Sequence, residues 1–164
     1  MNSSLIGWYH NKTSPKANKG LFPKILINDI RNIPIKEISP KAQEPFIAKA
    51  DIMLDKNKEL QEVKSEFIDW LKDTFEIEKL SKKVENFQDL EEKEFTKELK
   101  KKIPKEKREF SPSKLSNLKK YFNEYKTKAL DLKQIIDKTD KEIDKMVYDL
   151  YELTDEEIKI VEGN

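Results

Sequence analysis

The 164-residue sequence has no cysteine, three glycines, one histidine and no long apolar run. Without cysteine it forms neither disulfides nor thiolate metal sites, so a reducing, cytoplasmic location is the simplest expectation. The single histidine, His10, excludes a histidine-rich metal site and any catalytic triad that needs a second histidine. No apolar run reaches about eighteen residues and no signal-peptide core is present, so we expect a chain that neither spans a membrane nor is exported by that route.

Charged residues make up 40% of the chain and hydrophobic residues 36%. With so little glycine, this composition favours long helices with solvated faces over a sheet protein. Disorder is the alternative for a highly charged chain, but eight Phe, five Tyr and two Trp at helical spacing argue against it. We therefore expect a mainly α fold, with one domain or one domain plus an appendage.

The longest pattern runs from Leu115 to Leu153, where apolar residues recur at alternating steps of three and four. This spacing predicts one helix over about residues 112–153 with a coiled-coil seam along one face. Its seam positions are Leu115, Leu118, Phe122, Tyr125, Ala129, Leu132, Ile136, Thr139, Ile143, Met146, Leu150 and Leu153.

A second seam of the same kind runs from Phe46 to Thr74 and predicts a helix over about residues 45–75. Asn57 and Thr139 are the only uncharged polar residues inside the two seams. Buried polar layers often set the register of a coiled coil, so we expect an antiparallel pair with Asn57 opposite Thr139. The same register places Phe67 opposite Ala129, a large residue facing a small one.

Shorter helices are expected around this pair. The apolar spacing indicates two connecting helices over about residues 78–87 and 89–103, the second ended by Pro104. A capping box, Thr154 to Glu157, starts a last helix over 154–162. Within Lys97 to Arg108, seven basic residues face only two acidic ones. This segment is either a phosphate-binding patch or an ordinary solvated turn at the tip of the helical region.

The first 42 residues differ in composition and are expected to form a small, irregular α/β head. A short helix through Leu5 to Tyr9, an exposed loop over Asn11 to Gly20 and a strand over Lys24 to Ile27 are predicted. Asn28 to Asn32 reads as a turn and Ile33 to Ile35 as extended, because Pro34 forbids a helix there. Residues 1–42 are thus separated from a helical coiled-coil domain over residues 43–164.

The head is basic, with seven lysines and arginines against Asp29 and Glu37. Lysine supplies charge for phosphate contacts, and asparagine supplies short hydrogen bonds. An ordinary solvated loop would have a similar composition, and both interpretations stay open. The candidate DNA-binding residues are His10, Asn11, Lys12, Lys16, Lys19 and Lys24.

Three segments resemble a known family of DNA enzymes. They are Phe22 to Ile35 (FPKILINDIRNIPI), Pro45 to Asp51 (PFIAKAD) and Ile143 to Thr154 (IDKMVYDLYELT). Together they look like the C-terminal target-recognition and helical region of type IIG restriction-modification enzymes and TaqI-like adenine-specific DNA methyltransferases. Type I specificity subunits have a related layout. The resemblance covers the chain from about Leu5 to Val161.

The resemblance has two departures. Where such enzymes commonly read Tyr-Gly-Leu-Thr, this chain has glutamate at position 152, although glycine would ease a left-handed helix terminus. The chain also lacks the Asn-Pro-Pro-aromatic motif that holds a flipped adenine, a glycine-rich loop for S-adenosylmethionine and the Pro-Asp of a common nuclease motif. The resemblance therefore implies that catalytic domains lie upstream of Met1, and that the parent enzyme uses S-adenosylmethionine and Mg²⁺ while this fragment binds no cofactor.

The sequence thus predicts a noncatalytic DNA-recognition and positioning fragment of a type IIG-like methyltransferase. Its expected partners are double-stranded DNA and the upstream methyltransferase or nuclease domains. The alternatives are part of a type I specificity subunit or a structural coiled-coil module that binds a partner helix or forms a homo-oligomer. Four apolar residues off the seam of residues 45–75 favour such a module: Ile47, Leu54, Ile68 and Trp70.

Overall fold

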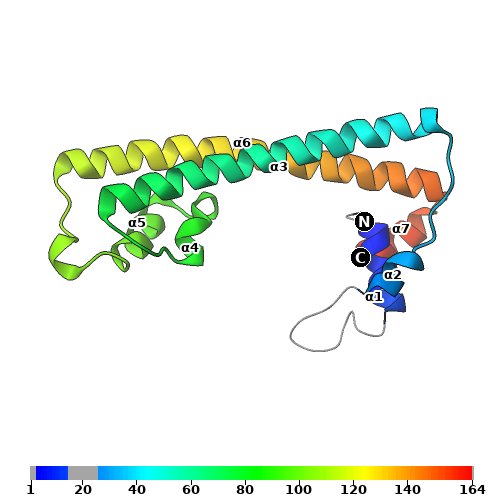
Figure 1. Cartoon of the computed structure of the whole chain (residues 1–164), viewed down its shortest axis with the longest axis horizontal. Helices are drawn as coiled ribbons and strands as arrows, with labels where there is room; N and C mark the ends of the chain where they lie inside the picture. The colour runs from blue at the N-terminus through cyan, green and yellow to red at the C-terminus, as the bar shows by residue number, and fades with distance from the viewer. Residues whose placement is uncertain (1–2, 15–25, 164) are drawn as a thin grey trace. The chain divides into compact units, whose positions relative to one another are not determined.

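The computed structural model describes residues 3–14 and 26–163, and its regular elements are all helical (Figure 1). No strand occurs in these ranges, so the predicted mainly α fold is confirmed. None of the described helices is long and apolar enough to cross a bilayer. The helices are α1 (Ser4–Thr13), α2 (Ile27–Arg31), α3 (Pro40–Phe75), α4 (Lys82–Glu85), α5 (Glu92–Lys100), α6 (Pro112–Tyr151) and α7 (Asp155–Glu162), with 3-10 turns η1 (Phe87–Asp89) and η2 (Lys105–Lys107).

The chain divides into two compact units. Unit 1 comprises Met1–Met53 and Asp137–Asn164, and unit 2 comprises Leu54–Ile136. Both long helices contribute to both units, because each is far longer than a small core can cover. The expected boundary after residue 42 divides the head from the helical coiled-coil domain and does not coincide with the limits of these packing units. The division into these two domains stays a prediction.

Helices α3 and α6 pack on each other in antiparallel directions, as predicted. In unit 2, the ring of Phe67 stacks on Tyr125 with centroids 5.2 Å apart, and Trp70 packs on Tyr121 at 4.6 Å. In unit 1, Lys49 of α3 pairs with Glu142 of α6. A later residue of α3 thus meets an earlier residue of α6, which is the signature of an antiparallel pair.

The ring contacts are offset from the predicted layers. Phe67 was expected opposite Ala129, yet it stacks on Tyr125, one helical turn earlier on α6. Ala129 is fully buried in the same core, so the two seams located buried positions but not ring partners. The physical reason is that other rings also crowd Phe67. Asn57 and Thr139 belong to different units, and their pairing stays a prediction.

Aromatic rings dominate the core of unit 2. Phe67 contacts Phe87 of η1 at 4.5 Å and Phe95 of α5 at 5.7 Å between centroids. Phe95 stacks in turn on Phe122 of α6 at 4.5 Å, and all four rings are buried. Residues 76–110 therefore form the third layer that the broad apolar face of α3 requires, with Ile68 and Trp70 packed against it. Ile47 and Leu54, the other two residues off the seam, remain 55% and 72% exposed.

The connecting helices are shorter than predicted. Helix α4 begins at Lys82 because Ser81 caps it, accepting a hydrogen bond from the Val84 amide. The preceding residues contribute buried side chains instead of a helical turn, since Ile77 and Leu80 are at most 6% exposed. Helix α5 ends at Lys100, and Ile103 enters the core before Pro104. The predicted bounds of 78–87 and 89–103 were wrong by a turn or less at most ends.

The head differs most from expectation. Ile27–Arg31 is a helix, so the predicted turn over Asn28 to Asn32 is wrong, as is the assignment of Ile27 to a strand. The turn was predicted with a capping Asn or Asp side chain, and in the structure the Asp29 carboxylate accepts the Leu26 amide proton and so caps this helix. Helix α1 continues to Thr13, whereas a loop was predicted from Asn11. The expected β component does not occur in the described residues; Ile33 to Ile35 are non-helical, as Pro34 predicted.

Each of the two long helices is followed by a glutamate whose backbone is in the left-handed conformation. Glu76 after α3 has φ of 54° and Glu152 after α6 has φ of 59°. In both cases the next amide reaches back to close the helix: Ile77 N–H donates to the Lys72 carbonyl at 3.0 Å, and Leu153 N–H to the Tyr148 carbonyl at 3.1 Å. The terminus for which glycine is the common residue therefore forms here with glutamate.

Core packing around Phe67 predicts a large stability effect. Phe67→Ala should lower the free energy of unfolding by about 3–5 kcal/mol, because it leaves a cavity among buried rings. Leu54→Ala, on the same helix but 72% exposed, should change it by less than about 0.5 kcal/mol. Urea denaturation followed by circular dichroism measures both. Equal losses in the two variants would contradict the described core.

The left-handed glutamate after α6 gives a second prediction. Glu152→Gly should be more stable than Glu152→Ala by about 1 kcal/mol, since both lose the same side chain and only glycine is unstrained at this φ. At Lys138, exposed within α6, the order should reverse by a similar amount, because alanine is the better helix former. Thermal unfolding of the four variants compares them directly. The same order at both positions would exclude a left-handed residue 152.

Candidate nucleic-acid interface

The candidate interface is the head in unit 1, and a carboxylate of α6 fixes its first helix. The Ser4 amide donates to Asp144 Oδ1 at 2.7 Å, and the Ser4 hydroxyl donates to Asp144 Oδ2 at 2.6 Å. Ser3, which precedes the helix, makes no side-chain capping bond to any described residue. A carboxylate at a helix N-terminus also interacts favourably with the helix dipole. Asp144 therefore caps α1 in place of a side chain from the residue before the helix.

The end of α6 also holds the segment after α2. Tyr151 donates its hydroxyl proton to the Pro34 carbonyl at 2.7 Å and accepts the Lys36 amide proton at 3.1 Å. Lys36 Nζ pairs with Glu152 Oε1 at 2.7 Å, and this hydrogen bond lowers the pKa of Glu152. Two side chains at one helix end thus hold Pro34 and Lys36 of the extended chain.

A third cluster joins α1 to α2. Asp29 Oδ2 accepts the Leu26 amide at 3.0 Å and the Ser14 hydroxyl at 2.9 Å, and His10 Nε2 lies 3.5 Å away. The Leu26 hydrogen bond is the main cause that lowers the pKa of Asp29, with Ser14 and His10 adding to it. Ser14 and Leu26 flank residues 15–25, so one carboxylate ties together the two ends of that segment.

Serine, histidine and aspartate therefore meet in one place, but not as a hydrolytic triad. In a triad the serine hydroxyl donates to histidine, and the aspartate holds the other histidine nitrogen. Here Ser14 donates to Asp29 instead, and Ser14 is only 7% exposed. The arrangement can hold backbone in place, but it does not activate a nucleophile.

The structure places three of the six predicted DNA-binding residues on the last turn of α1. His10 faces Asp29 and its side chain is only 18% exposed, which leaves little surface for a phosphate. Asn11 and Lys12 are exposed. Lys16, Lys19 and Lys24 lie outside the described residues. Contact of these residues with DNA stays a prediction.

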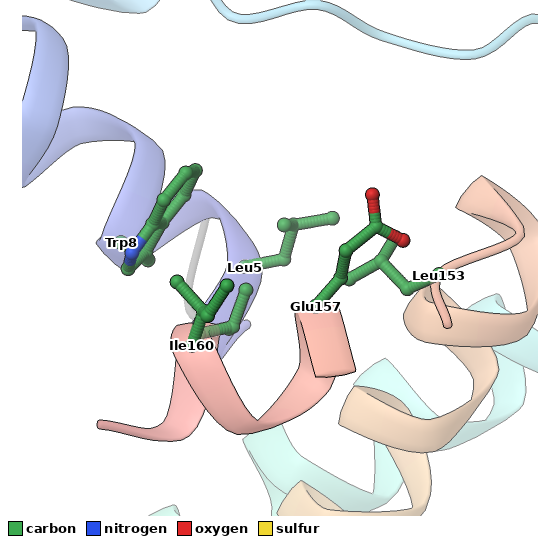
Figure 2. Close-up of a pocket in the computed structure, with 6 residues that line it drawn as sticks. Leu5, Trp8, Leu153, Glu157 and Ile160 are labelled. Carbon is green, nitrogen blue, oxygen red and sulfur yellow. The ribbon is translucent and has the colours of Figure 1, made fainter. Parts of the chain in front are cut away.

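An apolar groove lies between α1 and α7 (Figure 2). Its volume is about 260 Å³, and Leu5, Trp8, Leu153, Ile160 and Val161 line it together with Glu157. Glu157 accepts hydrogen bonds from the Thr154 amide and hydroxyl, which confirms the predicted capping box. The contacts between α1 and α7 show that α7 packs on the first helix of the head.

The charges of α6 in unit 1 favour one sign. Asp137, Asp140 and Asp144 lie close enough that burial and the other two carboxylates raise the pKa of Asp140. Like charges of this kind repel a phosphate backbone, so this face of α6 suits support rather than DNA contact. Among the described residues, no group of three or more histidine, cysteine, aspartate or glutamate side chains could hold a metal ion.

Sequence reasoning missed the residues that position the head. Asp29 was visible as one of two acids in a basic segment, and the Tyr151 region belonged to a segment that carried the resemblance. Asp144 belongs to the same segment, but its contact with Ser4 could not be predicted, because the two residues lie 140 positions apart in the chain. Side-chain contacts over such separations depend on the tertiary fold.

A comparison with family models finds a match to one entitled Domain of unknown function (DUF8810), over residues 39–147. The chain belongs to this family. The DUF8810 match covers nearly all of α3 and α6 and the connecting helices α4 and α5, whereas α1, α2 and α7 lie outside it. Comparisons with curated proteins and with solved structures find no match.

The lowered pKa of Asp29 predicts a pH-dependent contribution to stability. A carboxyl whose pKa is lower in the folded state stabilises the fold above its usual value of 3.8, and this contribution disappears as pH falls through the folded value. Asp29→Asn should therefore be less stable than the parent at pH 7, and the difference should shrink in acid. Urea denaturation at neutral and acidic pH measures the change.

Two controls accompany this test. Glu37→Gln removes an exposed acid of the same segment and should cost less at neutral pH. Hydrogen exchange of the Leu26 amide should accelerate in Asp29→Asn, because its acceptor is weakened. A difference between Asp29→Asn and the parent that stays constant across pH would contradict the role of the carboxylate.

Proposed function

We propose that this DUF8810 chain is a noncatalytic DNA-recognition and positioning fragment of a type IIG-like restriction-modification methyltransferase. The observation that carries the proposal is the attachment of the head to the end of α6. Asp144 holds α1, and Tyr151 holds the segment at Pro34 and Lys36. A long helix whose end fixes a basic segment in this way suits the placement of that segment on a surface.

The charge of the head supports DNA as the partner. Phosphate contacts from lysine and asparagine fix the orientation of a protein on a duplex. Lys12 is exposed on the last turn of α1, and the carboxylate of Asp29 ties together both flanks of the segment that carries Lys16, Lys19 and Lys24.

The chemistry is proposed to reside elsewhere in the parent enzyme. In this proposal, upstream domains use S-adenosylmethionine and Mg²⁺ for adenine methylation or DNA cleavage in the cytoplasm, and this fragment orients them. The cluster of His10, Ser14 and Asp29 supports a noncatalytic role, because its hydrogen bonds do not activate the serine.

A salt titration of duplex binding tests the proposal. The head variant Lys12→Gln/Lys16→Gln/Lys19→Gln should bind a DNA duplex more weakly than the parent chain. The slope of log affinity against log salt should become shallower by about 0.9 for each phosphate that the variant no longer neutralises. Fluorescence anisotropy of a labelled duplex gives both quantities.

The matched control is the remote variant Lys120→Gln/Lys138→Gln/Lys141→Gln, whose lysines are exposed on α6. It removes the same net charge, so a weakening common to both variants reports charge alone. A salt-insensitive affinity, or equal slopes in the head and remote variants, would contradict DNA binding by the head.

A second candidate function is a coiled-coil interaction module. The exposure of Ile47 and Leu54, 55% and 72%, favours it, since large apolar side chains on a helix commonly mark a contact surface. The burial of Ile68 and Trp70 against the core of unit 2 weakens it. A dimeric solution mass that becomes monomeric in Ile47→Lys/Leu54→Lys would support this function.

The layout of a type I specificity subunit is the remaining alternative. The open reading frame that precedes this chain discriminates between the two enzyme types. Methyltransferase motifs in the same frame would support the type IIG-like parent, whereas a separate upstream methyltransferase subunit would support the type I arrangement.

A further inference from the structure

Positive charge is concentrated in unit 2 on the last turn of α5 and on the chain that connects α5 to α6. Figure 1 shows the course of this connection. Seven of the twelve residues from Lys97 to Arg108 are basic, and only Glu98 and Glu106 are acidic. The head proposal makes no use of this segment. Its sequence leaves open whether it is a solvated turn or a phosphate-binding surface, and the ion pairs help to decide.

Within the described part of the chain, intramolecular ion pairs occupy only two of these cations. Lys101 pairs with Glu98 at 2.6 Å, and Lys107 pairs with Glu76. Six basic residues of this segment and the start of α6 lie beyond ion-pair distance of every carboxylate that the structure describes: Lys97, Lys100, Lys102, Lys105, Arg108 and Lys114.

Aromatic rings hold two of the six basic groups. Lys100 Nζ lies 5.0 Å from the centroid of Phe110, and Lys114 Nζ lies 4.6 Å from the centroid of Phe75. The two rings contact each other at 4.9 Å. A ring face attracts a cation but carries no net charge, so it does not compensate the charge of either ammonium group. Two cations are thus positioned on one aromatic platform.

The backbone of the segment is also fixed. Ile103 is only 2% exposed and packs in the core of unit 2. Arg108 Nε–H donates to the Ile103 carbonyl at 2.8 Å, and the 3-10 turn Lys105–Lys107 lies between them. The exposed Lys102 and Lys105 therefore extend from an anchored chain, which lowers the entropy lost when they bind an anion.

We call the surface formed by Lys97 to Lys114 the α5–α6 link. We propose that the α5–α6 link binds the phosphodiester backbone of a nucleic acid. Lysine ammonium groups act as point charges for phosphate oxygens, and several such groups on one surface suit a polymer with regularly spaced charges. The inference goes beyond the head proposal and does not rest on it, because the residues, the helices and the packing unit are different.

The test uses the full chain and a link variant, Lys97→Gln/Lys102→Gln/Lys105→Gln. All three lysines are exposed, so the variant should keep the helical circular dichroism and unfolding midpoint of the parent. Affinity for a labelled duplex is measured across a range of salt. The slope of log affinity against log salt should become shallower by about 0.9 for each lysine–phosphate pair removed, and so by about 2 to 3 in all.

The remote variant at Lys120, Lys138 and Lys141 is the matched control, because it removes the same charge from other parts of α6. Its slope should stay close to that of the parent. A link variant that behaves like this control would overturn the inference. DNA and RNA duplexes of one sequence form the two arms, and weaker binding of either duplex by the link variant supports binding of a phosphate backbone.

The binding affinities of the head variant and the link variant distinguish the two proposed surfaces. Weaker binding in the link variant alone supports this inference and contradicts the head proposal. Weaker binding in the head variant alone does the reverse. Weaker binding in both, each with a shallower salt slope, supports two binding surfaces, and a parent chain that binds neither duplex overturns both.

Discussion

The apolar stripes of α3 and α6 must be buried against each other, and every other element depends on this packing. A two-helix pair hides only one side of each stripe, so helices of this length need additional layers. In unit 2, residues 76–110 supply that layer with the rings of Phe87 and Phe95. In unit 1, α1 and α7 pack together beside the end of α6, and its polar side chains hold α1 and the chain before α3.

The two units are stabilised by different interactions. Unit 2 depends on a buried aromatic cluster, whose removal costs several kcal/mol per ring. The head depends on hydrogen bonds that Asp29, Asp144 and Tyr151 make to backbone and hydroxyl groups. Such bonds contribute about 0.5–1.5 kcal/mol each, or more when charged, so they can place a segment without a large core.

The distribution of paired and unpaired charge links structure to the proposed roles. In unit 1, Asp144 of α6 caps the first helix of the head, and burial together with the carboxylates of Asp144 and Asp137 raises the pKa of Asp140. Basic side chains of the α5–α6 link mostly lack carboxylate partners among the described residues, and they rest on rings or an anchored backbone. Net charge near zero for the whole chain hides this separation, because the two signs collect on different segments.

Local patterns in the sequence determined the helices, their caps and the identity of the buried faces. The apolar seams of α3 and α6 depend on spacings of three and four residues, and the capping box depends on the three-residue spacing of Thr154 and Glu157. The sequence alone specifies these spacings. The ring partners of Phe67 and the contact of Asp144 with Ser4 were decided by tertiary structure. Both features bring together side chains from segments that lie far apart in the chain. Packing energy selects among arrangements that local propensity leaves nearly equal in free energy.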